Sequence, residues 1–322
     1  MSEPAPGCSP KRAVFSQDKL TLYRYAPLAP SCGQRPVLIC YALVNRPYMM
    51  DLQEDRSLIR VLLKAGIEVY LIDWGYPDGA DRLLNLDDYI NGYLHRCVRH
   101  IVASHPVDAV NLLGVCQGGT FSLCYVAMHP ERVQNLILMV APIDFKTPEN
   151  LLSKWVQGIN VDLMLQAGNV PGGMLNMAFL LLMPFRLTQQ KYVGLMDLLD
   201  NPRELQNFIR MEKWIFDSPD QAGAAFGEFI RWFYQENRLI KGTLEIGGRK
   251  VDLASVSLPV LNLYALRDHI VPPSASETLG VRINSRDYSA AGIDTGHIGM
   301  YVSGRALREV PSKIIGWLEA RR

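Results

Sequence analysis

The chain has 322 residues, of which 48% are hydrophobic and 20% charged, and its formal net charge is +1. This length and composition suffice for one large α/β domain with an insertion, or for two domains. No basic block is present, which argues against nucleic acid as a partner, and the longest apolar run, residues 37–44, is too short to cross a bilayer as a helix.

The six cysteines do not form a metal-binding or disulfide pattern. None of them stands in a CxxC pair, and no histidine cluster has the spacing of metal ligands. The N-terminal segment is mostly polar and rich in proline, so it does not have the apolar stretch of a signal peptide. We therefore expect a cytoplasmic protein with free thiols, no metal and no cofactor.

The first part of the chain alternates between apolar runs and amphipathic segments. Residues 1–12 are predicted to be a flexible tail, followed by a β-hairpin over residues 13–25. Two apolar runs, residues 37–43 and 68–74, have the composition of strands buried on both faces. A helix is predicted between them at residues 51–64.

The same alternation continues as far as residue 146. Apolar side chains recur on one face of a predicted helix at residues 86–104. Buried strands are predicted at residues 109–113 and 135–140, with a helix at residues 121–128 between them. Strands that alternate with helices form a parallel sheet, so the predicted fold class is α/β.

The alternation stops over residues 147–250. This segment is rich in methionine, contains Trp155, Trp214 and Trp232, and shows no buried-strand pattern. We expect a helical insertion that covers a cleft as a lid. A separate helical domain without a part in the chemistry is the alternative, because methionine and aromatic side chains also fill ordinary cores.

The sheet pattern returns after the insertion. Strands are predicted at residues 259–265 and 286–290, and a closing helix at residues 307–320. The α/β core would then consist of residues 13–146 and 251–322, interrupted by the insertion.

A short stretch around Cys116 has the layout of a nucleophile elbow. An apolar run ends in Gly114, one residue precedes Cys116, and Gly118 and Gly119 follow before the helix. In such a turn the nucleophile has a strained backbone conformation, and the flanking glycines let strand and helix close around it. We expect Cys116 to be a nucleophile, and a buried structural cysteine in an ordinary βα turn is the alternative.

Ligands of parallel sheets bind at the carboxyl ends of the strands. Four candidate side chains follow predicted strands: Cys116, Asp144, Asp268 and His297. The chain order of α/β-hydrolases is nucleophile, acid and histidine, which selects Cys116, Asp268 and His297. His297 would accept the thiol proton, and Asp268 would orient the imidazole. Asp144 is the rival acid, and His269 is a possible neighbour of the site.

A nucleophile of this kind needs two N–H donors for the oxyanion of its tetrahedral intermediate. The first donor is expected to be the backbone of Gln117, the residue after the nucleophile. The second should come from the loop after the first buried strand, where we favour the N–H of Val44. Its neighbour Asn45 is a further possible site residue.

Several stretches of the chain resemble the poly(3-hydroxyalkanoate) synthases. Residues 114–119, with the sequence Gly-Val-Cys-Gln-Gly-Gly, are similar to the modified lipase box of that family. Further stretches that resemble the family are residues 41–48, 73–75, 211–217, 268–272 and 296–299. The resemblance extends over nearly the whole chain from about Ser9, and it is greatest to the short catalytic subunit of the two-component (class III) synthases.

The resemblance implies an α/β-hydrolase fold and a polymerisation reaction. The enzyme would join (R)-3-hydroxyacyl-CoA units with short side chains, such as 3-hydroxybutyryl-CoA, into a polyester and release coenzyme A. Cys116 would hold the growing chain as a thioester, His297 would activate Cys116, and Asp268 would help to activate the substrate 3-hydroxyl. A second synthase subunit, a homo-oligomer and a cytoplasmic location at polyester granules are also implied.

An apolar lid would have a function in such an enzyme, because the acyl group has to pass to a hydroxyl and not to water. One departure from the family concerns the N-terminus, where members of this type usually carry a helical segment and this chain has a Pro-rich tail before Ala13. Two alternatives remain. One is a thioesterase or dienelactone-type hydrolase of the same fold, and the other is a non-enzymatic granule protein on a hydrolase scaffold.

Overall fold

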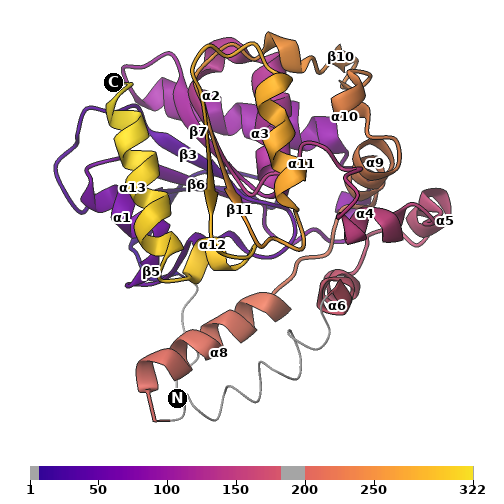
Figure 1. Ribbon diagram of the computed structural model, residues 1–322, viewed down its shortest axis with the longest axis horizontal. Helices are drawn as coiled ribbons and strands as arrows, with labels where there is room; N and C mark the ends of the chain where they lie inside the picture. Colours follow the sequence, from indigo (N-terminus) through magenta and orange to yellow (C-terminus); the bar gives the residue numbers. More distant parts are fainter. Residues whose placement is uncertain (1–6, 183–199, 322) are drawn as a thin grey trace.

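The computed structural model describes residues 7–182 and 200–321, and an eight-stranded sheet forms its centre (Figure 1). In spatial order the strands are β1 (Lys11–Gln17), β2 (Leu20–Tyr25), β6 (Val69–Asp73), β3 (Val37–Cys40), β7 (Val110–Val115), β8 (Val133–Met139), β11 (Val260–Ala265) and β12 (Tyr288–Ile293). The first two pairings are antiparallel, and all pairings from β6 to β12 are parallel. This order confirms the predicted mostly parallel sheet.

The middle of the sheet is buried on both faces, as continuous apolar runs require. Every residue of β7 is buried, and its Leu113 is paired with Ile39 of β3 and Ile137 of β8. Side chains alternate between the two faces, so Leu38 and Ile39 belong to different hydrophobic clusters. The core therefore consists of two apolar layers, one on each side of the sheet.

Helices cover both apolar layers (Figure 1). The layer that contains Leu38 is covered by helices α2 and α3, and the layer that contains Ile39 by α1 and α13. The helices of this part of the chain are α1 (Leu58–Lys64), α2 (His95–Ser104), α3 (Gln117–Met128), α11 (Pro273–Glu277), α12 (Gly299–Val302) and α13 (Ala306–Glu319). The predicted helix at residues 86–104 is confirmed over most of its length, with a π-helical segment, Asp88–Leu94, leading into α2.

The segment predicted to be a helical insertion is mainly helical where it is described. Its helices are α4 (Leu151–Val156), α5 (Val161–Leu165), α6 (Gly172–Leu182), α8 (Pro202–Phe216), α9 (Gly223–Glu228) and α10 (Arg238–Lys241). A π-helical segment, Phe229–Gln235, follows α9. Two two-residue strands, β9 (Glu245–Ile246) and β10 (Arg249–Lys250), form a small hairpin at the end of this segment. Residues 183–199 of the predicted lid lie outside the described residues.

The prediction of a helix at residues 51–64 is wrong for its first half. Residues 51–57 form a hairpin of two short strands, β4 (Asp51–Gln53) and β5 (Arg56–Ser57), and α1 begins only at Leu58. The side-chain oxygen of Ser57 caps α1 by accepting from the N–H of Arg60 at 2.9 Å.

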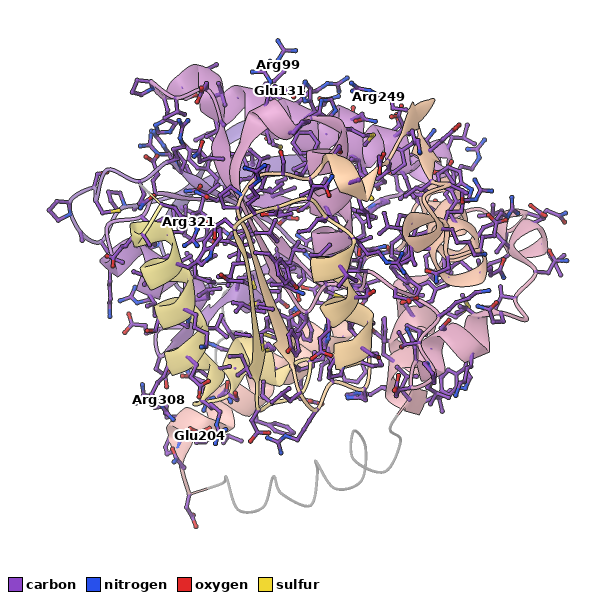
Figure 2. All side chains as sticks on the ribbon, turned by 45° about the horizontal axis from the view of Figure 1, so that its top comes forward. Arg99, Glu131, Glu204, Arg249, Arg308 and Arg321 are labelled. Atoms are coloured by element: carbon purple, nitrogen blue, oxygen red, sulfur yellow. The ribbon has the colours of Figure 1, made fainter. Side chains whose placement is uncertain are left out.

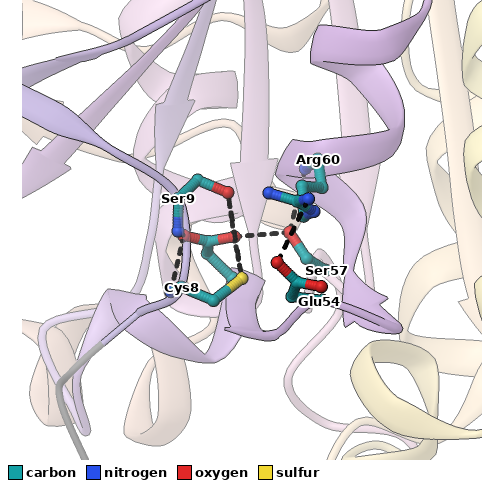
Figure 3. A network of polar contacts seen from close by, with 6 residues as sticks. Cys8, Ser9, Glu54, Ser57 and Arg60 are labelled. Atoms are coloured by element: carbon teal, nitrogen blue, oxygen red, sulfur yellow. Dashed lines mark hydrogen bonds and ion pairs between the residues drawn. The ribbon is translucent and has the colours of Figure 1, made fainter. Parts of the chain in front are cut away.

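The hairpin exists because Asp51 is the acceptor of a buried hydrogen-bond network (Figure 3). Its carboxylate accepts from the N–H of Ser9 at 2.8 Å, from the Ser9 hydroxyl at 2.9 Å and from the Ser57 hydroxyl at 2.6 Å. The N–H and the thiol of Cys8 donate to the same carboxylate, each at 3.1 Å. The predicted flexible tail is therefore ordered from Cys8 onward, and β1 already begins at Lys11.

Strand β1 forms one edge of the sheet. Its pairing with β2 contains a register shift between Ala13 and Phe15, which is the mark of a β-bulge. Lys11 and Arg12 stand at its start, and the Lys11 ammonium lies 4.5 Å from the ring centroid of Tyr23 on β2. The edge strand is thus irregular and positively charged.

Candidate active site

Cys116 lies in the sharp turn between β7 and α3. Its φ of 53° and ψ of −125° place a non-glycine residue in a strained backbone conformation, which is the geometry predicted for the elbow. The N–H of Cys116 donates to the carbonyl oxygen of Met139 on β8 at 2.9 Å, which fixes the turn against the sheet. The Cys116 side chain is half-buried, whereas Cys40 and Cys124 are fully buried.

The glycines around Cys116 are required by close contacts. A Cβ atom on Gly118 would lie 2.2 Å from the carbonyl oxygen of Cys40, and one on Gly114 would lie 2.6 Å from the Cα atom of Gly119. Real Cβ atoms do not approach other atoms so closely, so a larger residue at either position would push strand and helix apart. The glycine pattern read in the sequence therefore has the predicted structural cause.

The structure joins His297 to Asp268. The Nδ1 atom of His297 lies 2.7 Å from Oδ2 of Asp268, and both side chains are buried. The other carboxylate oxygen, Oδ1, accepts from the N–H groups of Ile270 and Val271, each at 2.9 Å. These hydrogen bonds fix the orientation of the Asp268 carboxylate. The carboxylate in turn fixes the orientation of the His297 imidazole.

Cys116 is the second group beside His297, and the pKa of His297 reflects both Asp268 and Cys116. Burial alone would lower the pKa, but the Asp268 carboxylate and the Cys116 sulfur attract the imidazolium and raise the pKa to about 10. An imidazole held in this way can accept the proton of a neighbouring thiol. The predicted trio of Cys116, His297 and Asp268 is thus brought together in one place.

The rival acid Asp144 has other partners. Its Oδ1 atom accepts from the side-chain amide of Asn237 at 2.8 Å and from the N–H of Lys146 at 3.0 Å. These bonds attach the loop after β8 to the insertion, and the carboxylate that contacts His297 is that of Asp268. His269, the predicted neighbour, follows Asp268 directly and is half-buried.

The loop after β3 lies against the elbow. The side-chain oxygen of Gln117 accepts from the N–H of Leu43 at 3.0 Å, which ties the loop to the first residue of α3. Gln117 begins that helix, so its own N–H has no acceptor within the helix. Val44 is half-buried and packs against the same hydrophobic cluster as Cys116. The roles of Gln117 and Val44 as oxyanion donors remain predictions.

Asn45 belongs to a set of contacts that attach the insertion to this loop. Its side-chain amide donates to the hydroxyl of Ser218 at 2.7 Å, and its φ of 60° turns the chain at this point. Further hydrogen bonds between the two segments are Trp214 Nε1 to Arg46 O (2.7 Å), Tyr48 Oη to Asp217 (3.0 Å) and Gln221 Nε2 to Leu43 O (3.1 Å). At the other end of α8, where Figure 2 labels Glu204, both carboxylate oxygens of Glu204 accept from one guanidinium nitrogen of Arg56, at 3.0 Å each.

Three tyrosines near Cys116 were missed by the sequence reasoning. All three are buried: Tyr41, Tyr234 and Tyr301. Burial raises the pKa of Tyr234, and a negative charge at Cys116 raises it further. The ring of Tyr301 lies 6.0 Å from that of His297, almost perpendicular to it at 79°. The four-residue spacing of His297 and Tyr301 is the one signal in the sequence that could have indicated their proximity.

Neither a metal site nor a membrane-spanning helix is found among the described residues. Within residues 7–182 and 200–321, no group of three or more His, Cys, Asp or Glu side chains is arranged to hold a metal ion. None of the helices in these ranges has the length and hydropathy needed to traverse a bilayer.

The raised pKa of His297 makes stability depend on pH. The pKa is 6.5 for an ordinary histidine and about 10 in the folded chain, so the folded state binds more protons between these values. We expect the stabilisation from the charged His297 to be complete below pH 6.5 and to be lost as the pH rises toward about 10. Urea unfolding of the wild type and His297→Gln across this interval measures it. A constant difference in unfolding free energy would contradict the expectation.

Comparison with known proteins agrees with the fold and the motifs. The family described as "alpha/beta hydrolase fold" matches residues 35–302, and the one described as "Poly-beta-hydroxybutyrate polymerase (PhaC) N-terminus" matches residues 7–62. Two relatives are named "Poly(3-hydroxyalkanoate) polymerase subunit PhaC". The relative from Allochromatium vinosum is 58% identical over 98% of this chain and 90% of its own length. The relative from Synechocystis is 51% identical over 98% of this chain and 86% of its own length.

Solved structures share the architecture at much lower identity. A monoacylglycerol lipase from Paleococcus ferrophilus superposes with a TM-score of 0.60 at 18% identity, over 94% of this chain and 99% of the lipase. A thermophilic esterase from Thermogutta terrifontis has a TM-score of 0.52 at 15% identity, over 97% and 98% of the two chains. These likenesses establish the fold alone. The relatives of more than 50% identity show that the chain belongs to the poly(3-hydroxyalkanoate) polymerases, as a PhaC-type catalytic subunit with the α/β-hydrolase fold.

Proposed function

We propose that this chain polymerises (R)-3-hydroxyacyl-CoA, with 3-hydroxybutyryl-CoA as a substrate, through a thioester on Cys116. The observation that carries the proposal is the buried, hydrogen-bonded pair of Asp268 and His297 next to Cys116, which lies at a strained elbow. This arrangement suits transfer of an acyl group through a covalent intermediate. The family to which the chain belongs supplies the expectation that the acceptor is a hydroxyl.

In the first step, Cys116 transfers its proton to Nε2 of His297, and its sulfur attacks the thioester carbonyl of the substrate. The N–H groups of Gln117 and Val44 stabilise the oxyanion of the tetrahedral intermediate. When the intermediate collapses, the bond to the coenzyme A sulfur breaks. The leaving thiolate takes the proton from His297, so coenzyme A departs as a thiol and the acyl group stays on Cys116.

In the second step, the 3-hydroxyl of another 3-hydroxyacyl-CoA attacks the acyl–Cys116 thioester. His297 accepts the hydroxyl proton and returns it to the Cys116 sulfur, while Asp268 stabilises the imidazolium between the two transfers. The product is an ester-linked chain, longer by one unit, on coenzyme A. It acylates Cys116 again by the first step and releases coenzyme A.

The insertion over residues 147–250 has the role of a lid in this proposal. Contacts of Trp214, Asp217 and Ser218 attach it to the loop that carries Val44. Its side chains Phe229 and Tyr234 pack on Phe145, in the loop after β8. An apolar cover at this position would keep water from the acyl–Cys116 thioester and so favour transfer to a hydroxyl.

The proposal is tested by incubating the full chain with 3-hydroxybutyryl-CoA, alone and with a candidate second synthase subunit. We expect coenzyme A release together with insoluble polyester, and we expect the partner subunit to increase both. Coenzyme A and free 3-hydroxybutyrate are measured in the same samples. Stoichiometric free acid without polymer would identify a thioesterase instead, and no release with either preparation would leave the scaffold without this activity.

A further inference from the structure

Two tyrosine hydroxyls next to the candidate active site have no part in the steps above. Tyr41 and Tyr301 are only 3% and 4% exposed, and their ring centroids lie 6.2 Å apart at an angle of 57°. Tyr301 lies in α12, four residues after His297, and the two rings meet edge to face. The pair therefore lies beside the imidazole that contacts Cys116.

Tyr41 lies close to the elbow as well. It is the residue that follows β3, and its backbone packs against α3 so closely that a Cβ on Gly118 would lie 2.6 Å from the Tyr41 carbonyl oxygen. Gly118 is two residues after Cys116. Tyr41 and Tyr301 thus converge on the nucleophile from two different segments of the chain.

The hydroxyl of Tyr301 is buried and makes no hydrogen bond of normal geometry to a described residue, although the hydroxyl of Tyr41 lies near it. Buried hydroxyls in folded proteins are nearly always paired, so an orphan next to a reactive centre calls for an explanation. Burial, and then the charges at Cys116 and Asp268, raise the pKa of Tyr301. Burial and Cys116 likewise raise the pKa of Tyr41, so both hydroxyls stay protonated and can donate.

We propose that the Tyr301 hydroxyl, with Tyr41 beside it, binds the oxygen on C3 of the acyl group and selects 3-hydroxyacyl over unsubstituted acyl thioesters. This inference rests on the proposed function and assigns its substrate selectivity to a named side chain. A 3-hydroxyl can accept from Tyr301 and fill its vacant hydrogen bond. A plain hydrocarbon chain would leave the buried hydroxyl unpaired, and sites built to bind a hydroxyl discriminate against analogues without it.

The test compares two substrates in one step. Single-turnover coenzyme A release is measured with 3-hydroxybutyryl-CoA and with butyryl-CoA, using the full chain and Tyr301→Phe. We expect Tyr301→Phe to lower the rate with 3-hydroxybutyryl-CoA by about 10- to 100-fold and to leave the rate with butyryl-CoA nearly unchanged. A general loss of geometry would instead lower both rates together, so the ratio of the two rates separates selectivity from a structural role.

Tyr25→Phe is the matched control. The Tyr25 hydroxyl is also buried without a hydrogen-bond partner among the described residues, but its charged neighbours are Asp51 and Asp73 and not Cys116. We expect this variant to keep the wild-type ratio. Tyr41→Phe provides a second variant at the site and is expected to lower the ratio in the same direction.

An unchanged ratio in Tyr301→Phe, or an equal loss with both substrates, would overturn the inference. Failure of the proposed function looks different. Acylation of Cys116 precedes polymerisation and hydrolysis alike, so a wild type that makes free acid in place of polymer would refute the polymerase assignment while the ratio still reports on Tyr301.

Discussion

Replacement of Cys116 with alanine is expected to reduce coenzyme A release from 3-hydroxybutyryl-CoA by about 10⁴-fold or more, because the acyl acceptor of the first step is removed. The variant should still fold, since the side chain is half-buried and alanine is smaller. Release is followed with a thiol reagent, and folding by thermal unfolding. Coenzyme A release at an appreciable rate from Cys116→Ala would refute the covalent mechanism.

Two further cysteine variants make this experiment specific. Cys116→Ser should keep the fold and lose most activity, because a hydroxyl is much harder to ionise than a thiol. Near-normal turnover by the serine variant would argue against a thiolate nucleophile. Cys32→Ala removes another half-buried thiol, in a loop that bonds to Gly66, and should retain wild-type activity.

Asp268→Asn is expected to lower turnover by about 10³- to 10⁴-fold, with the fold intact. The reason is that the two carboxylate oxygens of Asp268 have different partners. Its Oδ1 atom accepts from the N–H groups of Ile270 and Val271, so an asparagine must keep its oxygen there and turn its NH₂ group toward His297. His297 would then accept at Nδ1 and carry its proton on Nε2, where it can no longer take the proton of Cys116.

Asp144→Asn is the matched control for this substitution. Asp144 also follows a strand of the sheet, but its carboxylate binds Asn237 and the N–H of Lys146. We expect wild-type turnover from this variant in the coenzyme A release assay. If Asp144→Asn were the more damaging of the two substitutions, the assignment of the acid to Asp268 would have to be reversed.

The elbow and the order of the three site residues could be predicted because their causes are local or topological. Gly114 and Gly118 are next to Cys116 in the chain, and the contacts that demand glycine are made within one strand–turn–helix unit. Asp268 and His297 follow strands of a parallel sheet, which brings their side chains to the same edge. The positions of these residues in the sequence were therefore enough to predict that they lie close together.

The errors have the opposite cause. Residues 51–57 have an acceptable helical pattern, but Asp51 binds Ser9, 42 residues earlier in the chain, and this tertiary contact outweighs helix propensity. The same contact orders part of the predicted tail. Tyr41 and Tyr301 were missed because tyrosine is common in cores, and only the packing of α12 against the loop after β3 shows that a hydroxyl is left unpaired there.

The charged, bulged edge of the sheet has a consequence for the behaviour of many copies of the chain at once. An open edge strand offers unpaired N–H and C=O groups to any neighbouring molecule, and a flat apolar edge invites strand-to-strand aggregation. The bulge between Ala13 and Phe15 twists β1, and Lys11 and Arg12 place positive charge on it. The charge and the bulge of β1 therefore work against extension of the sheet along this edge when copies of the chain are crowded together.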